Sequence, residues 1–189
     1  MYLKRKPRKK SLRETATIVG DDAYLDYEGG RLWVSAQDLL DPDIGDHRWT
    51  STIRQGRPSY FIRCGFNDEG KRSTMLLHRA ILGLKQGSKH HCDHIDGDVF
   101  NNRRSNLRKA TRRQNAMNSA LKPGNNTGIP GVHKIVRKSG MIVYRVKIAV
   151  ASGVNKQRYF SSFEEAVAWR LSMQKKLYKQ FAPTGRKAL

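Results

Sequence analysis

Cysteines, acidic residues and long apolar runs are all scarce in this chain of 189 residues. Its two cysteines, Cys64 and Cys92, lack a CxxC spacing, which excludes a disulfide framework and a zinc ribbon. No stretch approaches the ~18 apolar residues of a membrane helix, and the N-terminus lacks the apolar core of a signal peptide. These absences predict a cytoplasmic protein that is neither secreted nor bound to a membrane.

The shortage of acids leaves a large excess of positive charge. Lys and Arg number 37 against 16 Asp and Glu, which gives a formal net charge of +21. An excess of one sign predicts a polyanionic partner, namely nucleic acid. A merely solvated surface is the alternative, but it does not need so much charge of one sign.

Basic and acidic residues are also unevenly distributed along the chain, and this distribution predicts how the chain divides into modules. Residues 1–13 carry seven basic and no acidic residues, as is typical of a flexible basic arm. Residues 14–77 hold eleven acids and short β-type runs between Gly- and Asp-rich turns, which predicts a β-rich module. From Val99 to Phe163 there is no acid but fourteen Lys and Arg, so we expect this span to lie along the polyanion.

A segment rich in Pro and Gly, LKPGNNTGIPG, interrupts the basic half at residues 121–131 and prevents a long helix or strand there. We place a linker at 121–125, a folded domain at 126–182 and a short tail at 183–189.

Three aspartates and a histidine gather in the stretch CDHIDGDVFNNRRSNL, residues 92–107. We expect CDHI and LRKA to form two strands, with a turn-rich loop between them. The pattern TRRQ at Thr111 is a capping box, so a helix should begin there and carry Asn115 in its second turn. This predicts a β-hairpin with Asp93 and His94 near its first strand, and a helix that can aim Asn115 at them.

These residue types suit metal-assisted hydrolysis. A hard divalent cation prefers oxygen ligands, of which Asp93 supplies a charged one and Asn115 a neutral one. His94 can be neutral near pH 7 and take a proton from water. General-base help is worth ~3–5 kcal/mol, whereas phosphate-ester cleavage can demand ~20 kcal/mol, so we expect one metal ion to supply much of the rest.

Other interpretations of this stretch stay open. A calcium loop would place its carboxylates at positions 1, 3 and 5, but here they fall at 1, 4 and 6 without a glutamate at 12. A zinc site built from His90, His91 and Cys92 lacks a second ligand pair. The segment DGDVFNN by itself is typical of a structural Asx-rich turn, and the spacing to Thr111 and Asn115 is what favours a nuclease.

The string DHIDGDVFNNRRSNLRKATRRQN resembles the HNH nuclease motif of bacteriophage and intron-encoded homing endonucleases, over roughly residues 76–118. The resemblance implies a ββα-metal fold, which we place at residues 78–120. It also implies one Mg²⁺ or Mn²⁺ per active site, with Asp93 and Asn115 as metal ligands and His94 as the general base.

The resemblance gives roles to further residues. Asn106 matches the middle asparagine, which braces the hairpin loop. Four others look like loop-shaping residues rather than ligands: Asp96, Gly97, Asn101 and Asn102. His78 and Arg79 are similar to part of the family's preceding helix, where we expect a packed or surface histidine. Cys92 stands where an aliphatic residue is common, so we expect a small buried side chain.

Residues 126–182 contain three strand-like runs, GVHKIV, MIVYRVKIAV and KQRYFSSF, followed by a helical pattern with a serine cap. Alternation directs Val146 and Ile148 towards this helix and Arg145 and Lys147 outwards. This predicts a three-stranded antiparallel sheet packed on one helix, with a basic face suited to the DNA major groove.

The same span resembles the DNA-binding domain of plant ethylene-response factors, which also occurs fused to phage HNH nucleases. The match lies in Gly131-Val132, YRVKI and YFSSFEEAVAW. His133, Lys147 and Tyr159 replace the usual Arg, Glu and Trp, so base preference cannot be transferred. The candidate DNA contacts come from this sheet and from the nuclease motif: Arg108, Arg112, Arg113, His133, Arg137, Arg145, Lys147, Arg158 and Tyr159.

Together these patterns predict an α+β protein and a site-recognising HNH homing endonuclease. By resemblance, water attack leaves a 5′-phosphate and a 3′-hydroxyl. We expect double-stranded DNA as the partner and a monomer without an obligate protein partner, in the host cytoplasm if a phage encodes it. Two alternatives stay open: a DNA-binding regulator with an inactive hairpin, and a protein that binds or cuts RNA.

Overall fold

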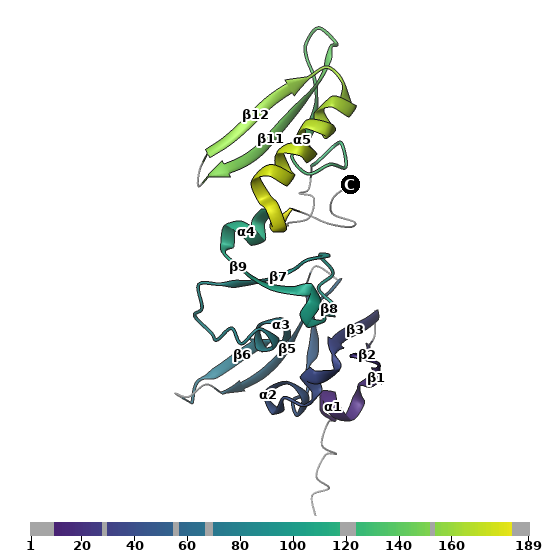
Figure 1. Ribbon diagram of the computed structural model, residues 1–189, viewed down its shortest axis with the longest axis vertical. Helices are drawn as coiled ribbons and strands as arrows, with labels where there is room; N and C mark the ends of the chain where they lie inside the picture. The colour runs from purple at the N-terminus through teal and green to yellow at the C-terminus, as the bar shows by residue number, and fades with distance from the viewer. Residues whose placement is uncertain are drawn as a thin grey trace, which may run out of the picture. The chain divides into compact units, whose positions relative to one another are not determined.

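The computed structural model describes residues 10–27, 30–54, 57–66, 70–117, 124–151 and 154–182, in two compact units (Figure 1). The first unit comprises Met1–His94 and Asp98–Lys109, and the second comprises Ile95–Gly97 and Ala110–Leu189. Small sheets and short helices alternate along the chain, so the predicted α+β class is confirmed. In the described ranges, no helix is long and apolar enough to cross a membrane.

The first unit is built from short elements that form three small sheets. In chain order these are α1 (Leu12–Thr15), β1 (Thr17–Val19), β2 (Asp22–Tyr27), β3 (Gly30–Ser35), η1 (Ala36–Leu39), α2 (Pro42–Gly45), β4 (Thr50–Arg54), β5 (Arg57–Phe66), β6 (Arg72–Leu76), α3 (Leu77–Ile81), β7 (His91–His94), β8 (Asn101–Asn102), η2 (Arg104–Asn106) and β9 (Leu107–Ala110). The sheet orders are β1-β2-β3-β8, β4-β5-β6 and β7-β9.

One hydrophobic core joins these sheets. Leu32 of β3, Phe61 of β5, Leu77 of α3 and Leu107 of β9 all belong to it and are at most 6% exposed. The predicted boundary at residue 77, between a β-rich module and the nuclease motif, therefore falls inside a shared core. Sheets of two to four short strands bury too little apolar surface to be stable alone, which is why they share one.

The helix α1 begins inside the segment predicted as a basic arm. Ser11 and Glu14 form a reciprocal capping box, with Glu14 N donating to Ser11 Oγ and Ser11 N donating to Glu14 Oε2. Leu12 is 2% exposed and contributes to the core of the first unit. The hydrogen bonds of the capping pair and the burial of Leu12 stabilise this helix despite the positive charge around it. Residues 1–9 of the predicted arm lie outside the described residues.

The second unit contains α4 (Arg112–Met117), β10 (Val132–Val136), β11 (Ile142–Ala151), β12 (Val154–Phe160), α5 (Phe163–Tyr178) and η3 (Lys179–Phe181). The three strands form an antiparallel sheet in the order β10-β11-β12, and α5 lies along it (Figure 1). Val132, Val146 and Ala166 are fully buried between sheet and helix. Ser162 caps α5 by accepting a hydrogen bond from Glu165 N.

The chain before β10 is tied to the sheet by two asparagines. Asn126 exchanges two hydrogen bonds of 2.9 Å with the backbone of Lys134. Asn125 donates to the carbonyls of Ile129 and Val132. Asn125, which we predicted to end the linker, thus already bonds to the domain. Residues 121–123 of the linker and the tail at 183–189 lie outside the described residues.

Gly131 is the residue of this loop with the least room for a side chain. Its φ is +79°, and an added Cβ would lie 2.6 Å from the Lys147 carbonyl oxygen. We expect Gly131→Ala to lower the free energy of unfolding of the second unit, because the left-handed backbone costs roughly 1–2 kcal/mol and the contact adds to it.

Gly140 is the matched control for this prediction. Its φ is +81°, but an added Cβ would have nothing within 4 Å. Gly140→Ala should therefore carry only the backbone cost, and Gly131→Ala should cost roughly 1 kcal/mol more. Urea denaturation in a Trp33→Phe, Trp49→Phe background, where fluorescence reports only Trp169, measures both. Equal losses would contradict the close approach at Gly131.

Candidate active site

The candidate site lies at the end of β7, where Asp93 and His94 are the last two residues of the strand. Both side chains belong to residues that are nearly inaccessible, with Asp93 3% and His94 6% exposed. The strand β7 pairs with β9, and the chain between them returns through β8 and η2. Because β8 also pairs in parallel with β3, Asn101 and Asn102 are fixed to the sheet β1-β2-β3-β8 of the first unit.

Asp93 is held by an arginine on the neighbouring strand. Arg108 Nε lies 2.7 Å and Nη2 lies 2.6 Å from Asp93 Oδ2. The side chain of Arg108 is 16% exposed, so water has little access to this ion pair. A buried carboxylate is tolerated only when it is paired in this way. We predicted Arg108 as a DNA contact; the structure gives its guanidinium Asp93 as a partner, and a phosphate contact by it stays a prediction.

His94 lies among three other side chains of the first unit. Its Nε2 is 3.5 Å from Asn102 Oδ1. Its ring is edge-to-face with the His78 ring at a centroid distance of 5.3 Å, and it stacks near Tyr60 at 6.3 Å. Tyr60 also contacts His78, at 4.9 Å between centroids. The imidazole of His94 is therefore fixed by packing as well as by the strand that carries it.

His78 and Arg79 of α3 support this arrangement. Burial lowers the pKa of His78 to about 3, with further contributions from the positive charges of His94 and Arg79. His78 is therefore a neutral packed histidine, as expected from the sequence. Arg79 donates to the carbonyls of Lys85 and His90, which fixes the loop before β7.

The asparagines and aspartates of the loop hold its shape. Asn106 Nδ2 donates to the Asn101 carbonyl at 2.8 Å, the kind of contact that a bracing residue makes across a loop. Asp98 Oδ1 accepts from Phe100 N, and Gly97 has a φ of +78°. Cys92 is partly buried, and burial together with the Asp93 charge raises its pKa to about 12, so it is an inert thiol.

Asn115 lies on α4, whose start matches the predicted capping box. Thr111 Oγ1 accepts from Gln114 N at 3.2 Å, and Thr111 N donates to Gln114 Oε1 at 2.8 Å. Asn115 N donates to the Thr111 carbonyl, which places Asn115 in the second turn. Since Asp93 belongs to the first unit and Asn115 to the second, their sharing of one cation stays a prediction.

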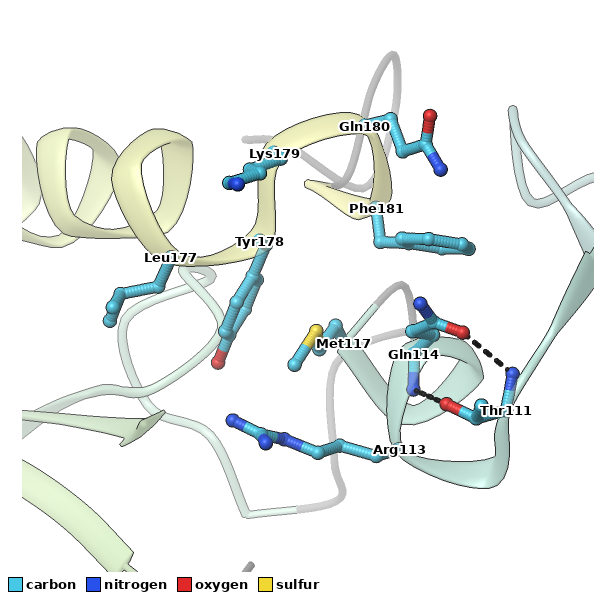
Figure 2. A pocket seen from close by; sticks show the side chains of 9 residues that line it. All are labelled: Thr111, Arg113, Gln114, Met117, Leu177, Tyr178, Lys179, Gln180 and Phe181. Carbon is cyan, nitrogen blue, oxygen red and sulfur yellow. Dashed lines mark hydrogen bonds between the residues drawn. The ribbon is translucent and has the colours of Figure 1, made fainter. Parts of the chain in front are cut away.

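A hollow of about 540 Å³ adjoins α4 in the second unit (Figure 2). Tyr178 and Phe181 enter it from the end of α5 and from η3, while Met117 and Gln114 enter from α4. Among the described residues that line it, the ionisable ones are Arg113, Lys179 and Tyr178. The candidate catalytic residues do not line this hollow, so it is not the candidate nuclease site.

The predicted pair of oxygen donors suits a hard cation. Among the described residues, no group of three or more His, Cys, Asp or Glu side chains could hold a metal ion. The ligands predicted from the sequence are one carboxylate, Asp93, and one amide, Asn115, and they stay a prediction. A small set of oxygen donors, completed by water and substrate phosphate, is what Mg²⁺ takes in phosphoryl-transfer sites, and so these residues fit it.

The face of the C-terminal sheet opposite α5 carries a row of three predicted DNA contacts, of which Tyr159 is exposed and His133 and Arg145 are half-buried. His133 pairs with Arg145, and Arg145 pairs with Tyr159, so the three side chains lie side by side on one face. Lys147 follows on the same face and is exposed.

Arg158 differs from this row. It pairs with Val146, whose side chain is buried under α5, so Arg158 lies on the helix-facing side at the sheet edge and packs over Phe160. The other predicted contacts are exposed and outside the row. Arg137 follows β10, while Arg112 and Arg113 lie on α4, where Arg113 also donates to the Val150 carbonyl.

Comparison with known proteins gives one match. No curated protein and no solved structure matches the chain. The family model described as HNH endonuclease matches residues 75–117, which include α3, β7, β8, β9 and α4. This match supports a nuclease that hydrolyses phosphodiester bonds of nucleic acid, and it covers the segment that contains Asp93 and His94.

Proposed function

We propose that this protein is a metal-dependent DNA endonuclease of HNH type that recognises a site on duplex DNA, as homing enzymes do. The observation that carries the proposal is the buried pair Asp93 and His94 at the end of β7, inside the segment that matches the family model. A carboxylate fixed by Arg108 beside an imidazole fixed by packing is a costly arrangement for a purely structural hairpin.

The proposed roles follow from the chemistry of each side chain. His94 takes a proton from the attacking water as the water oxygen bonds to phosphorus. The bond from phosphorus to the 3′-oxygen breaks, which leaves a 5′-phosphate, and the departing 3′-oxygen takes a proton from solvent to become the 3′-hydroxyl. Asp93 and Asn115 hold one divalent cation, which when bound stabilises negative charge on the phosphate and on the leaving oxygen. Arg108 orients the Asp93 carboxylate through its two contacts with Oδ2.

Site recognition is assigned to the second unit. Its sheet offers His133, Arg145 and Tyr159 in one row, with Lys147 beside them, and a basic β-surface can enter the major groove. The chain carries a formal net charge of +21, so binding should weaken steeply with salt, with about −0.9 in the log–log slope for each phosphate neutralised.

A plasmid-nicking assay tests the proposed function by removal of the metal. The full chain with supercoiled DNA and Mg²⁺ is expected to produce relaxed or linear product, and an excess of EDTA is expected to abolish it. Readdition of Mg²⁺ or Mn²⁺ should restore cutting, because an ion held by few protein ligands can leave the site and bind again.

The outcomes of this assay separate the alternatives. A parent protein that binds duplex DNA but cuts nothing with either metal would contradict the enzyme and favour a regulator. Cutting of structured RNA in preference to duplex DNA, in a competition between the two, would overturn the DNA assignment.

A further inference from the structure

The two nitrogens of the His94 imidazole are not equivalent in this structure. Nε2 faces Asn102 Oδ1 at 3.5 Å, while the His78 ring covers the imidazole edge-to-face at 5.3 Å. Hydrogen bonds of catalytic groups are often long without substrate and tighten when it binds, so the distance is compatible with a working contact. What matters is which atom of Asn102 faces the ring.

The orientation of the Asn102 amide is set by a second contact. Its Nδ2 donates to the Val99 carbonyl at 3.0 Å, and a carbonyl can only accept. The amide nitrogen of Asn102 therefore faces Val99, and its Oδ1 faces His94. Asn102 is 1% exposed, and its backbone pairs with Val34 in the parallel ladder of β8 and β3. The oxygen is thus presented from a buried residue on a fixed strand.

An amide oxygen has no proton to give, so its partner nitrogen must be the donor. In a neutral imidazole only one nitrogen carries the proton, and the lone pair is on the other. With Nε2 as the N–H, the lone pair of His94 resides on Nδ1. The contact with Asn102 therefore selects one of the two neutral tautomers.

We propose that Asn102 is a positioning residue that fixes the Nε2–H tautomer of His94, so that Nδ1 is the nitrogen that accepts the proton from the attacking water. This inference rests on the proposed function and deepens it. It gives Asn102 a role different from the loop-shaping one expected from the sequence. His78 assists by packing against the ring, which opposes the 180° ring flip that would put Cε1 in the place of Nε2.

The primary test is the tautomer itself, read by NMR on the full chain labelled with ¹⁵N-histidine at about pH 9, where an ordinary imidazole is neutral. The His94 signals are identified by their loss in His94→Ala. The parent is expected to show Nε2–H for His94, and Asn102→Ala is expected to shift the population towards Nδ1–H. Asn102→Asp should keep Nε2–H, because a carboxylate oxygen also only accepts.

Asn101→Ala is the matched control. Asn101 is the neighbouring asparagine of β8, and its Oδ1 contacts Arg103 rather than His94, so the tautomer should not change. A parent protein with Nδ1–H at His94, or an unchanged tautomer in a folded Asn102→Ala, would overturn the proposal. If Asn102→Ala does not fold, the parent spectrum alone still decides.

Kinetics supply the second readout. Asn102→Ala is expected to lower kcat by at least about tenfold with KM nearly unchanged, and Asn102→Asp is expected to recover most of that loss. The two proposals fail separately. A parent with the expected tautomer but no cleavage sinks the nuclease and leaves the Asn102 contact standing, whereas an active parent with the other tautomer sinks only the role of Asn102.

Discussion

His94→Ala is expected to lower the rate of DNA cleavage by about 10²–10⁴-fold, the range that a general base contributes. An imidazole can accept a proton from water near pH 7, and that of His94 follows Asp93 directly in the chain. His94 is 6% exposed and held by packing, so alanine leaves a small cavity, while Arg108 still pairs with Asp93. The measurement is single-turnover nicking of a plasmid in Mg²⁺, where the chemical step is observed directly.

Two controls make this result specific. His90→Ala removes an exposed histidine four residues earlier and is expected to cut at the parental rate. Affinity for duplex DNA, measured in EDTA, should be the same for His94→Ala and the parent, because His94 is assigned to chemistry. Added free imidazole is expected to recover part of the activity by entering the space left by the side chain. Parental cutting by a folded His94→Ala would remove His94 from the mechanism.

The elements around the site were largely predictable because their signals are local. The capping box at Thr111 and the strand LRKA depend on residues within one turn or one strand, and both appear as expected. In the second unit, alternation in β11 placed Val146 in the core and Lys147 on the surface, as the structure has them. A local pattern fixes local structure when tertiary contacts agree with it.

The contacts that complete the site were not predictable, since they join residues distant in sequence. Asn102 reaches its place because β8 pairs with β3, almost seventy residues earlier in the chain. Tyr60 and His78 meet His94 because β5, α3 and β7 share one core. The spacing of residues along the sequence does not predict such long-range contacts. From the motif, Asn102 was expected only to shape a loop.

The same non-local packing extends across one of the predicted boundaries. The sequence placed a module border at residue 77 because the charge composition changes there. Leu77 and Phe61 nevertheless lie in one core, and burial of apolar area counts for more than the charge of a surface. Likewise, Leu12 lies within a strongly basic run, yet its contact with this core sets where α1 begins.

Acidification is expected to destabilise the first unit through His78. The pKa of this buried imidazole is lowered from 6.5 to about 3 by burial and by the nearby charges of His94 and Arg79. Between these two pKa values His78 is protonated in the unfolded chain but neutral in the folded chain. The free energy of unfolding therefore falls as the pH decreases from about 6.5. At about 1.4 kcal/mol for each pH unit, the loss reaches about 2 kcal/mol at pH 5 and about 3 kcal/mol at pH 4.

His78→Gln tests this prediction because glutamine does not titrate. Urea denaturation at pH 7.5 and pH 5, in a Trp169→Phe background so that fluorescence reports only Trp33 and Trp49 of the first unit, gives the change in unfolding free energy for each protein. The pH-dependent loss in the parent should exceed that in His78→Gln by about 2 kcal/mol, whatever His78→Gln costs at pH 7.5. His90→Gln, at an exposed histidine, should keep the parental loss. If acidification lowers the unfolding free energy of His78→Gln as much as that of the parent, the lowered pKa of His78 is not the cause of the loss.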